Sequence, residues 1–194
     1  MVQGSSNTQE QRLAERLRLG DSEAMRELYA LYGGYLTAVG TRYLANQDDV
    51  KDVLQEAMVR VFTRIGSFHY RGQGSLRSWV ARIVVNASLN MLREKHRMEF
   101  TTLEDNLVEE DEDEEADDPP ISDVPPDELQ QMISRLPAGY RAVFCLYVME
   151  DKSHREIADM LGIGERTSSS QLSRAKNLLA KMIRQYHQQQ KSQR

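Results

Sequence analysis

The sequence contains few of the residues that form covalent cross-links or metal sites. Cys145 is the single cysteine, so no disulfide can form within the chain. The four histidines are far apart in sequence and show no ligand spacing, which argues against a metal site. We also find no nucleophile pattern and no phosphate-binding glycine loop. We therefore expect no metal, no cofactor, no small-molecule substrate and no enzymatic activity.

Long apolar runs are missing as well. No segment approaches the length of a membrane span, and residues 1–17 lack the apolar stretch of a signal peptide. These absences predict a cytoplasmic protein that does not insert directly into a membrane.

Basic residues are absent from one long segment, and this absence hides the charge of the remainder. Residues 99–128 carry fifteen Asp and Glu and no Lys or Arg. The net charge of the whole chain is −5, but outside this segment 25 Lys and Arg face only fifteen acids, a balance of about +10. Two basic lobes joined by an acidic segment favour a polyanion as binding partner.

Apolar periodicity predicts an all-α protein with two small helical domains. We place the first domain at residues 1–98, an acidic disordered linker at 99–126, the second domain at 127–186 and a polar tail at 187–194. The linker is assigned because its acidic run repels itself and its prolines interrupt helices. It is either a solvated tether or a polyanion that competes with nucleic acid or lies in a basic channel of a partner.

Residues 150–181 predict two helices around a glycine turn. Ser153 and Glu156 form a capping-box pattern, Gly162 suits a left-handed helix end, and the second helix should begin at about Glu165. An ordinary surface hairpin has the same outline. The outward face of short hydroxyls and cations favours a helix-turn-helix that reads duplex DNA. The candidate contacts are Arg155, Arg166, Thr167, Ser169, Ser170, Ser173, Arg174 and Lys176.

An earlier helix, predicted over residues 50–65, has an uninterrupted apolar stripe that includes Met58 and Phe62. Its other side is acidic although the lobe is basic. This side is either solvated surface or a docking face for a basic protein partner. The residues concerned are Asp49, Asp52, Gln55 and Glu56.

The glycine-rich loop 68–75 and the helix after it form a second candidate nucleic-acid site. Phe68, Tyr70 and Arg71 suit stacking on unpaired bases and contact with phosphate, unless the aromatic rings fold into the core. Ser75 is the expected cap of the helix, which should reach about Arg97. On one side of it, spaced by three or four residues, lie Trp79, Arg82, Asn86, Asn90 and Arg93.

These segments resemble extracytoplasmic-function sigma factors, the two-domain members of the sigma-70 family. DVLQEAMVRVF (residues 52–62) resembles the polymerase-docking motif, and SWVARIVVNASLNMLR (78–93) resembles the promoter-melting helix. Residues 136–176 resemble the second domain with its helix-turn-helix. The similarity covers roughly residues 10–97 and 127–186.

The resemblance implies a transcription initiation factor whose partners are core RNA polymerase and promoter DNA. It implies that Asp52, Gln55 and Glu56 meet the coiled-coil clamp of the largest polymerase subunits. Asn86 would lie near a flipped base of the −10 element, in a pocket shaped by loop 68–75. The linker would follow the path of the nascent RNA, and an anti-sigma factor is a common partner in this family.

The resemblance also implies that Ser169, Ser170, Ser173 and Arg174 face the −35 element. Two departures bear on this reading: Ser168 replaces the usual buried valine, and Ser169 replaces a frequent arginine. Consecutive serines predict a readout that is weak or depends on DNA shape.

Two other functions fit parts of the sequence. A helix-turn-helix regulator acting without core polymerase would explain the second domain but not the acidic face or Asn86. An all-helical adaptor without a nucleic-acid role would explain neither the basic lobes nor the helix-turn-helix.

Overall fold

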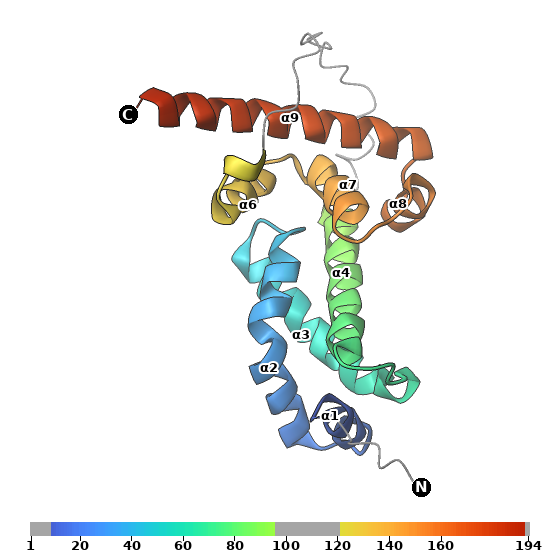
Figure 1. Cartoon of the computed structure of the whole chain (residues 1–194). Coiled ribbons are helices and arrows are strands. Elements are labelled where there is room, and N and C mark those ends of the chain that lie inside the picture. Colours follow the sequence, from blue (N-terminus) through green and yellow to red (C-terminus); the bar gives the residue numbers. More distant parts are fainter. Residues whose placement is uncertain (1–8, 96–120, 193–194) are drawn as a thin grey trace, which may run out of the picture. The chain divides into compact units, whose positions relative to one another are not determined.

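The computed structural model describes residues 9–95 and 121–192, and within these ranges every regular element is helical (Figure 1). The expected all-α fold is thus confirmed for the described part of the chain. Most of the predicted linker, residues 99–120, lies outside it. The chain divides into two compact units, 1–91 and 92–194, with the boundary in the last turn of α4. Within the described ranges, no helix has the length and apolar character needed to cross a membrane.

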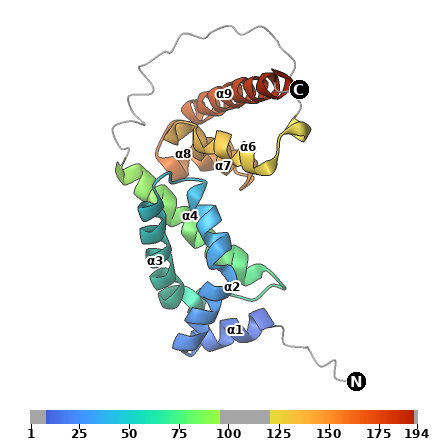
Figure 2. The same ribbon diagram turned by 90° about the vertical axis from the view of Figure 1, so that its left-hand side faces the viewer.

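The first unit consists of α1 (Gln9–Arg18), α2 (Ser22–Thr41), α3 (Gln47–Arg64), the short 3-10 helix η1 (Ile65–Ser67) and α4 (Ser75–Lys95) (Figures 1 and 2). Local capping sets two of the helix starts. Asp21 accepts a 2.9 Å hydrogen bond from the Glu23 N–H, and Asn46 accepts one of 2.8 Å from the Asp48 N–H. Asp21 and Asn46 are therefore the N-caps of α2 and α3.

Close helix approach in the first unit depends on Gly40 of α2. A Cβ at Gly40 would lie 3.2 Å from a methyl of Val50 on α3 and 3.9 Å from a methyl of Val84 on α4. Both valines are buried, so a larger residue would push the helices apart. Phe62 departs from the prediction, because 51% of it is exposed although the periodicity placed it in the apolar stripe.

The second unit consists of the 3-10 helix η2 (Ile121–Asp123), α6 (Pro126–Ser134), α7 (Ala138–Val148), α8 (His154–Leu161) and α9 (Glu165–Ser192). The long α9 packs against α6, α7 and α8 (Figure 1). It continues through residues 187–192 of the predicted polar tail. Buried Arg141 of α7 donates a 2.7 Å hydrogen bond to the Ser134 carbonyl, which ties α7 to the end of α6.

The helix-turn-helix geometry follows the sequence prediction. The Ser153 hydroxyl accepts a hydrogen bond from the Glu156 N–H at 3.3 Å, and the Glu156 carboxylate accepts one from the Ser153 N–H at 2.9 Å. Gly162 adopts a φ of 71° and donates to the Ala158 carbonyl at 2.8 Å. The capping box and the left-handed helix end are both confirmed.

Candidate functional site

The acidic face of α3 lies opposite the buried side of the helix. Asp52, Gln55 and Glu56 are exposed, and Asp49 is half-buried. Glu56 forms an ion pair with Arg60 one turn further on. The negative charge of this face is therefore carried most openly by Asp52.

Two apolar side chains continue the exposed surface of α3, and sequence reasoning missed this role for both. Val59 is 63% exposed and Phe62 is 51% exposed. Val59 follows Gln55 and Glu56 at helical spacing, and Phe62 lies two turns after Gln55, so they extend the same side of the helix. A signal was available, because Val59 breaks the period of the apolar stripe. The face thus combines carboxylates in its first half with apolar groups in its second.

Loop 68–75 does not present all the aromatic groups expected of it. Phe68 is only 3% exposed and packs against Trp79 with the ring centroids 5.4 Å apart. The expectation that Phe68 stacks on unpaired bases is therefore corrected: its ring belongs to the core, the alternative noted from the sequence. Tyr70 is half-buried and Arg71 is exposed, so both contribute to the surface of the loop.

The start of α4 also differs from the expectation. The Ser75 hydroxyl accepts a 3.2 Å hydrogen bond from the Arg71 N–H and does not cap the helix. Glu10 of α1 takes that role: its carboxylate accepts hydrogen bonds from the Leu76 N–H at 2.9 Å and the Arg77 N–H at 3.1 Å. Glu10, more than sixty positions away in the sequence, thus accepts from backbone N–H groups in the first turn of α4 that have no partner within the helix.

The outer side of α4 keeps the polar pattern read from the sequence. Arg82, Asn86 and Arg93 are exposed, and Asn90 is half-buried. Arg82 and Arg93 are eleven positions apart, which corresponds to about 16 Å along the helix axis at 1.5 Å per residue. Trp79, on the same side, is half-buried against Phe68 and therefore serves packing as well. This side offers two amides between two cations, which suits unpaired bases and their phosphates.

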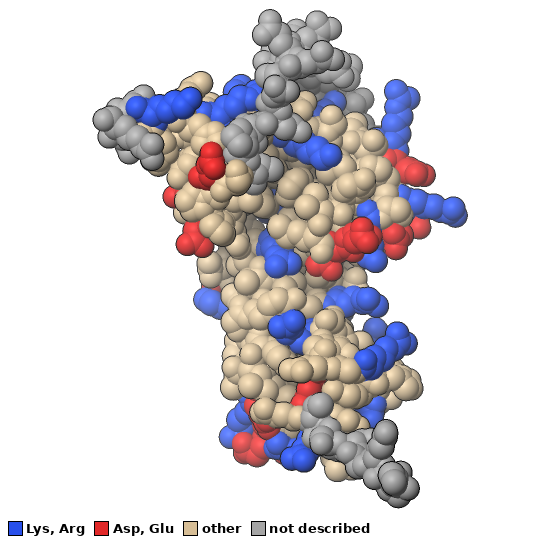
Figure 3. Space-filling model, viewed as in Figure 1, with Lys and Arg blue, Asp and Glu red and all other residues tan. Residues whose placement is uncertain are grey.

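The outward face of the helix-turn-helix carries the predicted polar set. Thr167 and Arg174 are half-buried, and the exposed members are Arg155, Arg166, Ser169, Ser170, Ser173 and Lys176. The Ser170 hydroxyl donates to the Thr167 carbonyl at 3.0 Å, so it is partly engaged by its own helix. No acidic residue follows Glu165 in the sequence, and Lys and Arg side chains line α9 in Figure 3.

One contact behind this face was not anticipated. Ser168 is fully buried, and its hydroxyl lies 3.0 Å from Nδ1 of His154 on α8. The His154 ring stacks on Tyr147 of α7, with centroids 4.9 Å apart. The sequence singled out Ser168 as unusual, but its partner is fourteen positions away and carries no local signal.

Within residues 9–95 and 121–192, no three His, Cys, Asp or Glu side chains gather in a way that could hold a metal ion.

Comparisons with known proteins assign both units. The family model of sigma-70 region 2 matches residues 28–98, and that of sigma-70 region 4 matches residues 127–179. The ECF RNA polymerase sigma factor SigM of Mycobacterium tuberculosis is 30% identical over 164 residues, or 84% of this chain and 79% of that protein. The chain is an extracytoplasmic-function sigma factor of the sigma-70 family.

Two further relatives extend the comparison. The ECF RNA polymerase sigma-E factor of Haemophilus influenzae is 28% identical over 184 residues, covering 90% of this sigma factor and 95% of the relative. A solved structure of the sigma factor RpoE with the anti-sigma factor NepR from Bartonella quintana aligns with a TM-score of 0.47 and 20% identity. The alignment covers 82% of this chain and 96% of the chain in that structure.

Membership of the family fixes the general activity. As an extracytoplasmic-function sigma factor, this protein binds RNA polymerase and directs it to promoters, and it is not an enzyme. The region 2 match contains loop 68–75 and the polar side of α4, whereas α1 precedes it. The region 4 match begins in α6 and ends partway along α9.

Proposed function

We propose that this sigma factor docks on core RNA polymerase through the exposed face of α3, captures unpaired −10 bases at loop 68–75 and α4, and reads −35 duplex with α9. The observation that carries the proposal is the exposure of the predicted contact residues to solvent. Every residue that the sequence assigned to these contacts is exposed or half-buried, with the single exception of Phe68.

The polymerase contact would combine charge with apolar burial. Asp52 and Glu56 would attract a basic surface, while Val59 and Phe62 would lose exposed area against the same partner. Burial of apolar surface contributes affinity, and charge complementarity contributes orientation and association rate. The coiled-coil clamp of the largest polymerase subunits, which the resemblance to the family implies as the contact, would be the partner of this face.

The −10 contact would use Tyr70 and Arg71 of the loop together with Asn86 on α4. An aromatic ring and a guanidinium can stack on an extruded base, and an amide can form two hydrogen bonds to a base edge. Capture of extruded bases then offsets the cost of unstacking them. Arg82 and Arg93 would hold the neighbouring phosphates.

The −35 contact would be mostly one of phosphates and shape. Arg166, Arg174 and Lys176 supply charge, while the serines at 169, 170 and 173 supply short hydrogen-bonding groups. Serine discriminates bases less sharply than a bidentate arginine does. We therefore expect a −35 preference that depends on groove width.

The acidic segment would act as a polyanion as well as a connection. Its fifteen carboxylates in residues 99–128 would oppose binding of free DNA to the basic lobes and imitate RNA in a basic channel of the polymerase. The protein would work in the cytoplasm, and an anti-sigma factor is a partner to be expected from the family.

A charge reversal tests the proposal. Asp52→Lys should lower capture of core polymerase in a pull-down, and circular dichroism should show unchanged helix content, because Asp52 points away from the core. Glu23→Lys is the matched control, since it reverses an exposed acid on α2. Equal loss with both variants would reject the α3 face as the docking site. Promoter binding without polymerase would favour the helix-turn-helix regulator instead.

A further inference from the structure

Helix α1 lies outside the region 2 match, yet it contacts both ends of loop 68–75. Arg18 donates from its guanidinium to the Phe68 carbonyl at the start of the loop. Glu10 accepts from the Gly74 N–H at 2.5 Å at the end of the loop, in addition to its two bonds with α4. The two side chains are eight positions apart, about 12 Å along the helix axis.

The Glu10 contact is a buried one. Glu10 is 7% exposed, and its two carboxylate oxygens receive three backbone N–H groups. A carboxylate at a helix N-terminus is stabilised both by these donors and by the helix dipole. Because two of the donors belong to α4 and the third to the loop, Glu10 fixes the direction in which the chain enters α4.

Loop 68–75 has two other contacts near its ends: the buried Phe68 ring packs against Trp79, and the Ser75 N–H donates to the Gly72 carbonyl at 3.1 Å. Gly72 and Gly74 adopt φ angles of 118° and 86°, and a Cβ at either position would meet nothing within 4 Å. The bond from the Arg71 N–H to the Ser75 hydroxyl is exposed. Backbone of this kind is easily disordered unless fixed at its ends.

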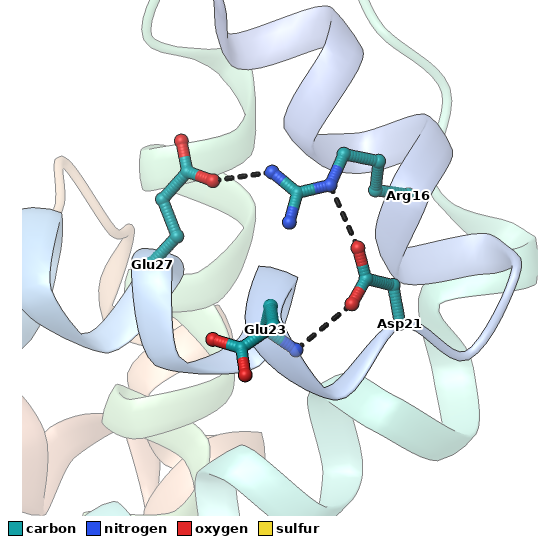
Figure 4. A network of polar contacts seen from close by, with 4 residues as sticks. All are labelled: Arg16, Asp21, Glu23 and Glu27. Atoms are coloured by element: carbon teal, nitrogen blue, oxygen red, sulfur yellow. Dashed lines mark hydrogen bonds and ion pairs between the residues drawn. The ribbon is translucent and has the colours of Figure 1, made fainter.

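Helix α1 is itself firmly anchored, so it can serve as a fixed support. Its own residues Leu13, Ala14 and Leu17 are buried in the core of the first unit. Figure 4 shows the polar anchor: Arg16 donates to Asp21 at 2.7 Å and to Glu27 of α2 at 2.5 Å. The same Asp21 caps α2 through the Glu23 N–H, which couples the two helices.

We propose that Glu10 and Arg18 are positioning residues that hold loop 68–75 in the shape that receives unpaired −10 bases. This inference rests on the proposed function of the loop. A loop that is already ordered loses less conformational entropy when a base binds, so the base binds more tightly. Neither side chain needs to touch DNA, since each acts through the backbone of the loop.

The test uses the full-length protein with Glu10→Ala, Glu10→Gln and, as matched control, Arg16→Ala. The control removes an anchor of the same helix without touching the loop. Hydrogen exchange at the amides of residues 74–77 should become faster in Glu10→Ala than in Arg16→Ala. Open-complex formation should fall roughly five- to tenfold, the factor that corresponds to loss of a helix cap. Affinity for core polymerase should not change.

Glu10→Gln keeps one acceptor oxygen and should give intermediate values, which also serves if the alanine variant folds poorly. The inference is overturned if exchange at residues 74–77 is unchanged, or if Glu10→Ala opens promoters as well as the parent while Asn86→Ala does not. It is equally overturned if polymerase affinity falls in parallel with opening, because Glu10 would then be only structural. Failure of the parent holoenzyme to open a promoter would instead reject the proposed function.

Discussion

The Nδ1 atom of His154 lies 3.0 Å from the hydroxyl of fully buried Ser168, which joins the first turn of α8 to the inner side of α9. The two helices pack together, and Ile157 and Leu161 of α8 and Leu172 of α9 are buried apolar residues. A hydrogen bond requires a narrower range of distance and angle than an apolar contact does. The hydrogen bond between His154 and Ser168 therefore restricts how α9 can shift or rotate relative to α8.

Removing the hydroxyl should weaken this restriction. Ser168→Ala should destabilise the second unit by about 1 kcal/mol, the usual net value of one hydrogen bond, because His154 loses its partner. Thermal unfolding of the full-length protein measures the effect. Ser169→Ala, one position away on the exposed side, should leave the midpoint unchanged. The same midpoint in Ser168→Ala and the parent would mean that the bond contributes nothing.

Gln171 presents the opposite case, a buried polar group without compensation. It is 2% exposed, and within the described ranges neither its amide oxygen nor its amide nitrogen finds a hydrogen-bond partner. A buried polar atom without a partner costs roughly 1–3 kcal/mol. Gln171→Met, which keeps the length of the side chain, should therefore raise the unfolding midpoint of the second unit.

The same variant separates packing from DNA recognition. Because Gln171 faces the core, binding of −35 duplex by Gln171→Met should equal that of the parent at the same temperature. Fluorescence anisotropy with a promoter duplex measures this. A lower midpoint would show that the glutamine amide is satisfied in solution, for instance by water.

Acid should weaken the capping box of α8. Hydrogen bonds from the Ser153 backbone and hydroxyl lower the pKa of Glu156 below its ordinary value of 4.5. A lowered carboxyl pKa means that the stabilisation is fully present above pH 4.5 and is lost as the pH falls through the folded-state value. The difference in stability between the parent and Glu156→Gln should therefore be constant near neutral pH and shrink in acid. Urea unfolding at a series of pH values tests this, and a difference that grew in acid would contradict it.

A contact could be predicted from the sequence when its two residues lie close together along the chain. Asp21 capping α2 and the Ser153–Glu156 box involve residues two or three positions apart, so the pattern itself contains both partners. The cap of α4 was predicted wrongly because Ser75 had the right residue type, whereas its competitor Glu10 comes from α1. Phe68 and Trp79 pack together across the loop, and only the folded chain shows that this contact buries the Phe68 ring.

The −10 assignment makes Asn86 the residue most sensitive to substitution on α4. Asn86→Ala should reduce promoter opening, because an amide that bonds a base edge contributes about 1–3 kcal/mol of discrimination. Core polymerase affinity should be unchanged, since the proposed docking face lies on α3 and not on α4. Permanganate footprinting at limiting holoenzyme reports the opening. Equal reactivity of mutant and parent would move the base contact to Tyr70 and Arg71.

The acidic segment offers the last prediction, which concerns charge alone. Residues 109–115 are seven consecutive acids, outside the described ranges. Replacing them with a neutral Gly/Ser stretch of equal length should raise the affinity of the free protein for non-promoter DNA. The increase should shrink with added salt, because it comes from phosphate contacts that release counterions and are screened.

A second readout distinguishes a polyanion from a spacer. If the segment occupies the RNA path in the polymerase, the neutral variant should also yield a different ratio of abortive to full-length transcripts, with fewer productive initiations. Anisotropy across a salt series and this transcript ratio test the two effects separately. If neither quantity changes, the seven carboxylates do no more than keep a connection soluble, and length becomes the only property of the segment that initiation requires.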